Sequence, residues 1–207
     1  MQQPIVHLVR VDLLLETISG IIALAVSHYA NNAYRITEQK RLADLSTGFL
    51  ILSAGMLGRV IGTLYFFVLQ NEGATGSSTL IVIVTIAYGM MRIMAYVIFA
   101  ISTRHIRAEK APSITTLLAL PFLLDPSLEM VAILVLIVVV LQSLMNYLSG
   151  RSSVALYVFI AFLLILASHI APVVAVNTIW GYLFSQILQF LGFTALLLML
   201  VRTGRNT

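Results

Sequence analysis

The positive charge of this chain is confined to alternate ends of its apolar stretches. Seven such stretches can be drawn through the 207 residues, and nine of the 12 lysines and arginines fall at one set of ends. Those nine are Arg35, Lys40, Arg41, Arg104, Arg107, Lys110, Arg151, Arg202 and Arg205. The other ends carry Arg10 and are otherwise neutral or acidic. Because lysine and arginine accumulate in cytoplasmic loops, this asymmetry predicts a polytopic membrane protein with its N-terminus outside and its C-terminus inside.

The composition agrees with a membrane location for the whole chain. Hydrophobic residues make up 60% of the sequence and charged residues 10%, whereas a soluble domain carries about 25% charged residues. Since about 20 apolar residues span a bilayer, we expect residues 1–207 to form one transmembrane domain. The net charge of +4 then indicates contact with membrane lipids and not with nucleic acid. The absence of cysteine excludes disulfides and thiolate metal sites.

Seven transmembrane helices are predicted from the apolar stretches and the polar breaks between them. Their ranges are 11–33, 42–69, 78–103, 112–124, 128–148, 153–170 and 177–201. The fourth is short and contains Pro121, which would kink or end a helix, so by its length it could be re-entrant. The charges favour a full span, because Asp125 and Glu129, which follow it, look external. The predicted fold is therefore an all-α membrane protein with seven spans.

The two halves of the chain indicate an internal duplication. A shift of 113 residues without a gap aligns two helix-loop-helix units around their basic turns. It superimposes Leu15-Glu16 on Leu128-Glu129, Tyr34 on Tyr147, Phe49-Leu50 on Phe162-Leu163 and Ala54 on Ala167. The predicted plan is three helices (1–103), a linker helix (111–125) and three more helices (127–207) in the same orientation, as in membrane proteins built from parallel repeats.

Four of the charged side chains inside the predicted spans are candidate site residues: Asp12, Glu16, Arg59 and Arg92. A charge at the bilayer centre is unfavourable by about 2.5–3.5 kcal/mol on insertion scales, so each should have a partner. Asp12 and Glu16 are spaced i, i+4 and share a helix face. Glu16 is expected to pair with Arg59, and the deeper Arg92 to reach the same cluster or backbone carbonyls. Such a cluster is either a ligand or proton site or, more simply, a structural ion pair that joins the first three helices.

The last predicted helix carries a polar stripe. Its members are Tyr182, Ser185, Gln186, Gln189 and Gly192. Unsatisfied amides are unfavourable in hydrocarbon, so this face should be buried against the first three helices or against a neighbouring subunit. The opposite face, with Leu183, Ile187, Leu191 and Leu198, should be more exposed to lipid.

No constellation of catalytic residues is visible, and the loops are too short to hold a soluble active site, so the protein is predicted to be non-enzymatic. No metal site is expected. His28 and His105 both fall toward the predicted cytoplasmic side and are the candidate axial ligands of a haem b. Because His105 lies in a basic loop, the expectation is that no cofactor is bound.

Two short stretches carry a family resemblance. Asn32-Ala33-Tyr34-Arg35-Ile36-Thr37 followed by Leu45-Ser46-Thr47-Gly48-Phe49-Leu50 resembles the helix-loop-helix units of small archaeal multi-pass membrane proteins, which include sensor modules. The resemblance implies a multi-pass protein of a prokaryotic cell membrane. In topology alone the chain is also similar to microbial rhodopsins and SWEET transporters. Retinal linkage is excluded because both lysines, Lys40 and Lys110, lie in loops, and the first helix of each predicted repeat lacks the hinge proline of SWEET transporters.

These observations lead to one principal functional prediction and two alternatives. The principal prediction is a non-enzymatic subunit or accessory module of a larger membrane assembly, with other membrane subunits or a second copy of the chain as its partner. The first alternative is a small-solute transporter or channel lined by Arg59, Arg92 and the glutamines of the last helix. The second is an electron-transfer subunit that binds haem b.

Overall fold

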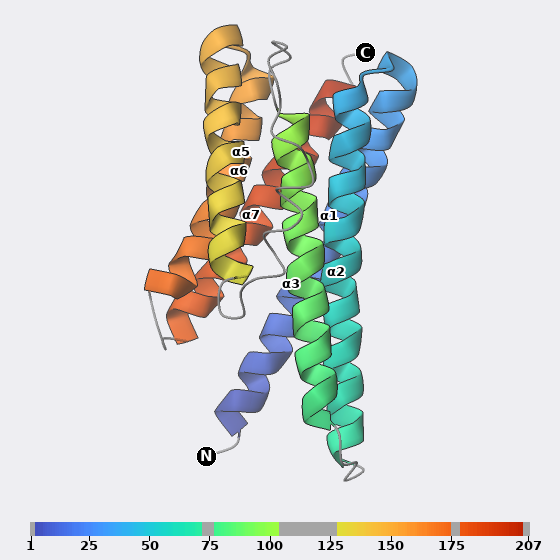
Figure 1. Ribbon diagram of the computed structural model, residues 1–207, viewed down its shortest axis with the longest axis vertical. Helices are drawn as coiled ribbons and strands as arrows, with labels where there is room; N and C mark the ends of the chain where they lie inside the picture. Colours follow the sequence, from blue (N-terminus) through green and yellow to red (C-terminus); the bar gives the residue numbers. More distant parts are fainter. Residues whose placement is uncertain (1–2, 72–76, 104–127, 175–178, 205–207) are drawn as a thin grey trace.

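Every element in the described part of the chain is an α-helix. The computed structural model describes residues 3–71, 77–103, 128–174 and 179–204, and side chains for 11–66, 79, 82–103, 128–174, 181 and 183–203. The helices are α1 (Gln3–Thr37), α2 (Lys40–Asn71), α3 (Ser77–Ser102), α5 (Leu128–Gly150), α6 (Ser153–Val174) and α7 (Ile179–Gly204) (Figure 1). Six of the seven predicted helices are therefore present. The predicted helix over 112–124 lies outside the described residues.

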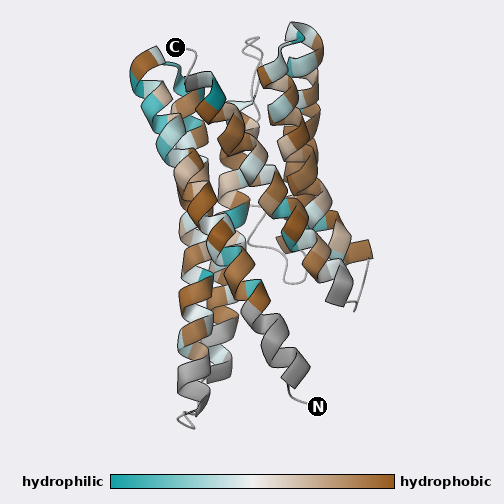
Figure 2. Cartoon of the chain, turned by 180° about the vertical axis from the view of Figure 1, so that it is seen from behind, coloured by the Kyte–Doolittle hydropathy of each residue, from teal (hydrophilic) through white to brown (hydrophobic). Residues whose placement is uncertain are grey.

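All six helices are long and apolar enough to cross a membrane. Large apolar side chains cover their outward faces, including Leu134 on α5 and Leu198 on α7, which are 58% and 64% exposed. The hydropathy colouring shows mostly apolar residues along the middle of the helices (Figure 2). Soluble proteins rarely expose apolar patches of this extent, so the fold is that of a multi-pass membrane protein.

One end of the bundle carries exposed basic residues. The α1–α2 turn, the α5–α6 turn and the end of α7 lie at one end, together with the C-terminus (Figure 1). Arg35, Lys40, Arg151 and Arg202 are exposed there. We call this the basic end and the other the opposite end.

Helices α3 and α5 run in the same direction. At the basic end, the Thr103 hydroxyl donates to Oε1 of Gln142 on α5 at 2.6 Å, and Nδ2 of Asn146 donates to the Thr103 carbonyl at 3.0 Å. Toward the opposite end, Arg92 of α3 forms an ion pair with Glu129 of α5. Helix α1 packs on α7, as α3 packs on α5. The packing therefore closes a ring in the order α1, α2, α3, α5, α6, α7.

The turns after α1 and α5 have the same backbone geometry. Glu38 follows α1 with φ 54°, and its amide donates to the Tyr34 carbonyl at 2.7 Å. Arg151 follows α5 with φ 43°, and its amide donates to the Tyr147 carbonyl at 2.7 Å. A left-handed residue that closes the last helical turn is a common helix C-cap. Both pairs of residues are related by the 113-residue shift found in the sequence.

Four phenylalanines from four helices form the centre of the core, which we call the aromatic cluster. They are Phe49 of α2, Phe99 of α3, Phe162 of α6 and Phe193 of α7, all fully buried. The ring of Phe99 lies 4.6 Å from that of Phe49 and 5.5 Å from that of Phe162, centroid to centroid. Phe49 and Phe162 are again 113 residues apart. Phe99 thus joins equivalent residues of the two halves.

Close packing of α6 on α7 depends on a glycine. A Cβ atom at Gly192 would lie 2.8 Å from Cγ1 of Ile165 and 3.0 Å from the carbonyl oxygen of Ala161. A Cβ atom at Gly58 of α2, by contrast, would have nothing within 4 Å. Only the first of these two glycines permits a helix contact that a larger residue would prevent.

Gly192→Ala is expected to destabilise the protein by about 1–3 kcal/mol, because overpacking forces side chains and backbone to move. The matched control Gly58→Ala should be neutral or stabilising by up to about 1 kcal/mol, since alanine is the better helix former. Thermal unfolding in mild detergent measures both. Equal effects of the two substitutions would contradict the close α6–α7 contact.

Candidate functional site

Arg59 holds two carboxylates of α1. Its Nη2 lies 3.1 Å from Oδ2 of Asp12, and its Nε lies 3.2 Å from Oε2 of Glu16. The one-turn spacing of the two acids lets a single guanidinium from α2 reach both. Glu16 is 1% exposed, whereas the side chains of Arg59 and Asp12 are 25% and 14% exposed, so the Glu16 side of the group is the buried one. The contact predicted between Glu16 and Arg59 is therefore present.

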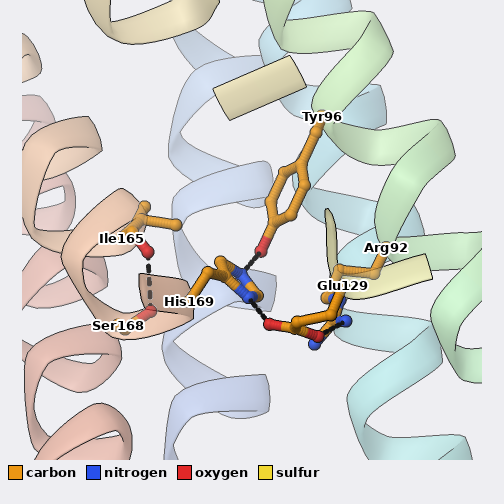
Figure 3. A network of polar contacts seen from close by, with 6 residues as sticks. All are labelled: Arg92, Tyr96, Glu129, Ile165, Ser168 and His169. Atoms are coloured by element: carbon orange, nitrogen blue, oxygen red, sulfur yellow. Dashed lines mark hydrogen bonds and ion pairs between the residues drawn. The ribbon is translucent and has the colours of Figure 1, made fainter. Parts of the chain in front are cut away.

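A second charged group lies on the other half of the ring. Glu129 forms ion pairs with Arg92 of α3 and with Nδ1 of His169 on α6, the latter at 2.5 Å (Figure 3). The other ring nitrogen of His169, Nε2, lies 2.6 Å from the Tyr96 hydroxyl. Arg92, expected to reach the Glu16 cluster or backbone carbonyls, has Glu129 as its ion-pair partner, a contact that the sequence did not predict.

The hydrogen-bond roles in this second group follow from the chemistry of its members. An ionised carboxylate can only accept, so Nδ1 of His169 must carry the proton that it donates to Glu129. In the neutral ring Nε2 is then an acceptor, and the Tyr96 hydroxyl donates to it. His169 is 3% exposed and Tyr96 is fully buried. Both ring nitrogens of a buried histidine are thus satisfied.

Two contacts join the charged groups into one structure. The guanidinium carbons of Arg59 and Arg92 lie 5.3 and 5.2 Å from the ring centroid of Tyr88, within cation–π range. Nε2 of Gln186 on α7 donates to Oδ1 of Asp12 at 3.2 Å. We call the whole set the polar network. Its members are Asp12, Glu16, Arg59, Tyr88, Arg92, Tyr96, Glu129, His169 and Gln186, and each of the six described helices supplies at least one.

The polar network crosses both interfaces between two groups of helices, α1–α3 and α5–α7, which we call the two units. The ion pair of Arg92 with Glu129 joins α3 to α5. The hydrogen bond of Gln186 to Asp12 joins α7 to α1. These are the same helix pairs through which the two units pack. A relative movement of the units would therefore have to break or exchange these contacts.

The polar stripe predicted for the last helix is buried inside the chain. Ser185, Gln186 and Gln189 of α7 are 6–7% exposed, while Ile187 and Leu198 on the other side are 46% and 64% exposed. Leu191 is also exposed, at 45%, and Leu183 is partly buried. The Tyr182 side chain lies outside the described residues. The stripe is thus covered within the chain, by α1 where Gln186 binds Asp12 and by α6 where Gly192 packs.

Some buried polar atoms near this interface have no hydrogen-bond partner among the described residues. They are Oε1 of Glu16, Oγ of Ser19 and Nε2 of Gln189. The hydrogen bond between Gln186 and Asp12 sets the register of the two helices, which run in parallel. Gln189 then lies near the level of Glu16, by the rise of about 1.5 Å per residue.

A cavity of about 920 Å³ lies at the basic end of the ring, between the ends of all six described helices. Its polar lining is mostly neutral and includes Asn32, Thr103, Asn146 and Thr203. Among the described lining residues, Arg41 is the one that carries a charge. The cavity can therefore accept a small polar molecule without an acidic side chain against it.

The aromatic cluster lies between this cavity and the polar network. Phe162 lines the cavity, and its ring packs against Phe99. Phe99 in turn packs against Tyr96, with ring centroids 6.3 Å apart, and Tyr96 binds His169. A continuous series of buried side chains thus leads from the cavity to the network.

The remaining predicted site residues are not part of this arrangement. His28 is exposed, and its ring contacts that of Tyr29 at 6.0 Å. His105 lies outside the described residues, so haem ligation by this pair stays a prediction. Within the described ranges, no group of three histidine, cysteine or acidic residues could hold a metal ion.

Sequence reasoning missed Glu129, His169, Tyr88 and Tyr96 as site residues. The 113-residue shift was a signal for one of them, because it places Glu129 at the position of Glu16. Comparison with protein-family models, with curated proteins and with solved structures finds no match to this chain. None of these comparisons therefore supports the resemblances noted in the sequence. The function has to be inferred from the polar network and the cavity.

Proposed function

We propose that this chain is a transporter that moves a small polar solute across a prokaryotic cell membrane. The observation that carries the proposal is the position of the polar network, which crosses both interfaces between the two three-helix units. Transporters built from repeats bind their substrates and coupling ions near the midplane, at the interface between the repeats. The polar stripe on α7, which favoured a subunit of a larger assembly, is already covered by α1 and gives that function less support.

The proposed topology has seven spans, with the N-terminus outside and the basic end in the cytoplasm. Exposed arginines and lysines at the basic end support this orientation. The parallel run of α3 and α5 supports a further crossing between them. The equivalent turns at Glu38 and Arg151 support two parallel repeats. With this orientation the cavity opens toward the cytoplasm, and the aromatic cluster closes the path to the outside.

The lining of the cavity limits the class of solute. Most of its lining is apolar, the polar groups among it are neutral hydroxyls and amides, and its charged lining residue is Arg41. Exposed basic residues, among them Lys40 and Arg151, lie at the same end. A solute with hydrogen-bonding groups and no net positive charge fits this environment. Transport then requires the two units to move relative to one another, with exchange of the contacts that join them.

The proposal is tested by blocking the cavity. The natural chain has no cysteine, so Ala155→Cys provides one thiol on the cavity wall. Reconstituted protein is assayed for uptake of radiolabelled sugars, amino acids, organic acids and inorganic anions. Modification of Ala155→Cys by a bulky maleimide should lower uptake of the transported solute to the level of protein-free liposomes.

Two sets of controls make this test specific. Tyr157→Cys lies on the same helix but is 42% exposed and does not line the cavity, so its modification should leave uptake unchanged. An impermeant reagent added to intact cells should label Val174→Cys at the opposite end and leave Gln39→Cys unlabelled. The reverse labelling would contradict the orientation. If no solute enters above background, the transporter proposal fails and partner subunits should be sought by co-purification in mild detergent.

A further inference from the structure

The wall of the cavity at the basic end is mostly apolar. Its lining includes Leu45 of α2, Val158 and Phe162 of α6, and Leu196 and Leu200 of α7. Sites that hold small organic molecules have volumes of about 300–1,000 Å³ and are lined mainly by hydrophobic side chains with a few polar groups. The cavity, with a volume of about 920 Å³, has both properties. Its occupant therefore needs an apolar part, which an inorganic ion lacks.

Most hydroxyl groups of the lining already donate their hydrogen within the chain. A hydroxyl has one hydrogen to donate. The hydroxyl of Thr103 donates to Gln142 at 2.6 Å. Four others donate to backbone carbonyls at 2.8–2.9 Å, namely those of Thr37, Ser102, Ser143 and Thr203. The wall thus offers a sugar, with its many hydroxyl groups, fewer hydrogen-bond donors than its polar residues suggest.

The charge around the cavity is mainly basic. The basic side chains described at this end are Arg35, Lys40, Arg41, Arg151 and Arg202. The acids described near them are Glu38 and Asp44, and neither lines the cavity, whereas Arg41 does. A guanidinium has five N–H donors, so Arg41 can bind a carboxylate and keep its contacts within the chain. The charged group that fits this end is therefore an anion.

We propose that the cavity binds an organic acid with an apolar body, with the carboxylate at Arg41 and the body against the apolar wall. The carboxylate then stays at the basic end, and no charge is buried among the apolar side chains. An inorganic anion lacks the apolar body, and an alkylamine has the wrong charge. The proposal names the substrate class of the transporter inferred above, and to that extent it rests on the proposed function. Binding of the acid does not.

Binding is measured by protection of a thiol on the cavity wall. Ala155→Cys is placed in nanodiscs of phosphatidylcholine, and its modification by the neutral reagent N-ethylmaleimide is followed as butanoate, hexanoate or octanoate is added. Each CH₂ group that enters an apolar site raises the affinity by up to about fourfold, so hexanoate should bind on the order of tenfold more tightly than butanoate. Tyr157→Cys, on the same helix but outside the cavity, should show no protection.

Matched ligands and variants test the role of charge. Hexanamide and hexylamine have the same chain without the negative charge and should protect more weakly than hexanoate. Arg41→Gln should lower the affinity for hexanoate by about two- to fivefold, the range for an exposed ion pair, and leave that for hexanamide unchanged. Arg35→Gln removes the same charge at the same end but outside the cavity, so both affinities should stay unchanged. An equal loss of hexanoate and hexanamide binding in Arg41→Gln would overturn the place of the carboxylate.

The outcomes separate this inference from the proposed function. Protection that grows with chain length and depends on Arg41 supports the organic acid. Equal protection by glucose or hexylamine would overturn it. So would slow modification in nanodiscs that contain an anionic phospholipid, before any acid is added, because the cavity would then hold lipid. Uptake of another solute without protection by hexanoate would refute the organic acid and leave the transport. Protection without uptake of any solute would refute the transport and leave the binding site.

Discussion

Glu129→Gln is expected to lower the free energy of unfolding by about 3–5 kcal/mol, the usual effect of breaking a buried ion pair from one side. Glu129 is the ion-pair partner of both Arg92 and His169. Nε of Arg92 already has no hydrogen-bond partner among the described residues. Loss of the carboxylate would thus leave a guanidinium, whose side chain is 13% exposed, without its compensating charge. Thermal and chemical unfolding in mild detergent measure the loss.

A double-mutant cycle distinguishes this effect from a general weakening of the helix contact. Glu129→Gln combined with Arg92→Gln removes both charges, so the double variant should be more stable than Glu129→Gln alone. Glu38→Gln, at the exposed turn after α1, is the matched control and should change stability by less than about 0.5 kcal/mol. Independent addition of the two network substitutions would show that Arg92 and Glu129 do not interact.

The charge pattern predicted the helices and one of the two ion-pair groups. Periodic placement of basic residues locates the ends of the spans. The number of residues from such an end then gives the depth of a side chain in the membrane. Depth was enough to pair Glu16 with Arg59, because their helices are joined by the short turn at residues 38–39 and have to be neighbours. The same reasoning predicted helices that are shorter than those in the structure. α1 continues to Thr37, and α6 passes through Pro172 to Val174.

Pairing between the two halves could not be predicted from depth. Arg92 and Glu129 meet because α3 packs on α5, and nothing in a hydropathy profile states which distant helices are neighbours. The contacts of His169 were equally hard to predict, because a histidine near the end of an apolar helix can face lipid, water or the core. The 113-residue shift held part of the missing information, because it relates Glu129 to Glu16 and Phe162 to Phe49. Equivalent positions in two packed repeats face the same axis.

Arg59→Gln is the second substitution with a large expected effect, again about 3–5 kcal/mol. One guanidinium serves both Asp12 and Glu16, so its removal takes this cation from two carboxylates whose side chains are 14% and 1% exposed. Arg59→Lys should recover only part of the loss, because an ammonium cannot match the two-sided fork of the guanidinium. Unfolding in mild detergent measures both variants.

The charge balance gives this prediction a clear signature. Combining Arg59→Gln with Glu16→Gln removes one of the two stranded carboxylates, so the double variant should be more stable than Arg59→Gln alone. Acid should act in the same direction, because protonation removes the charge of the two carboxylates. The gap in free energy of unfolding between Arg59→Gln and the natural chain should then become smaller. The control Arg35→Gln, at an exposed position of the basic end, should show neither effect. If the gap instead widens as the pH falls, Arg59 does not stabilise the protein by balancing these two acids.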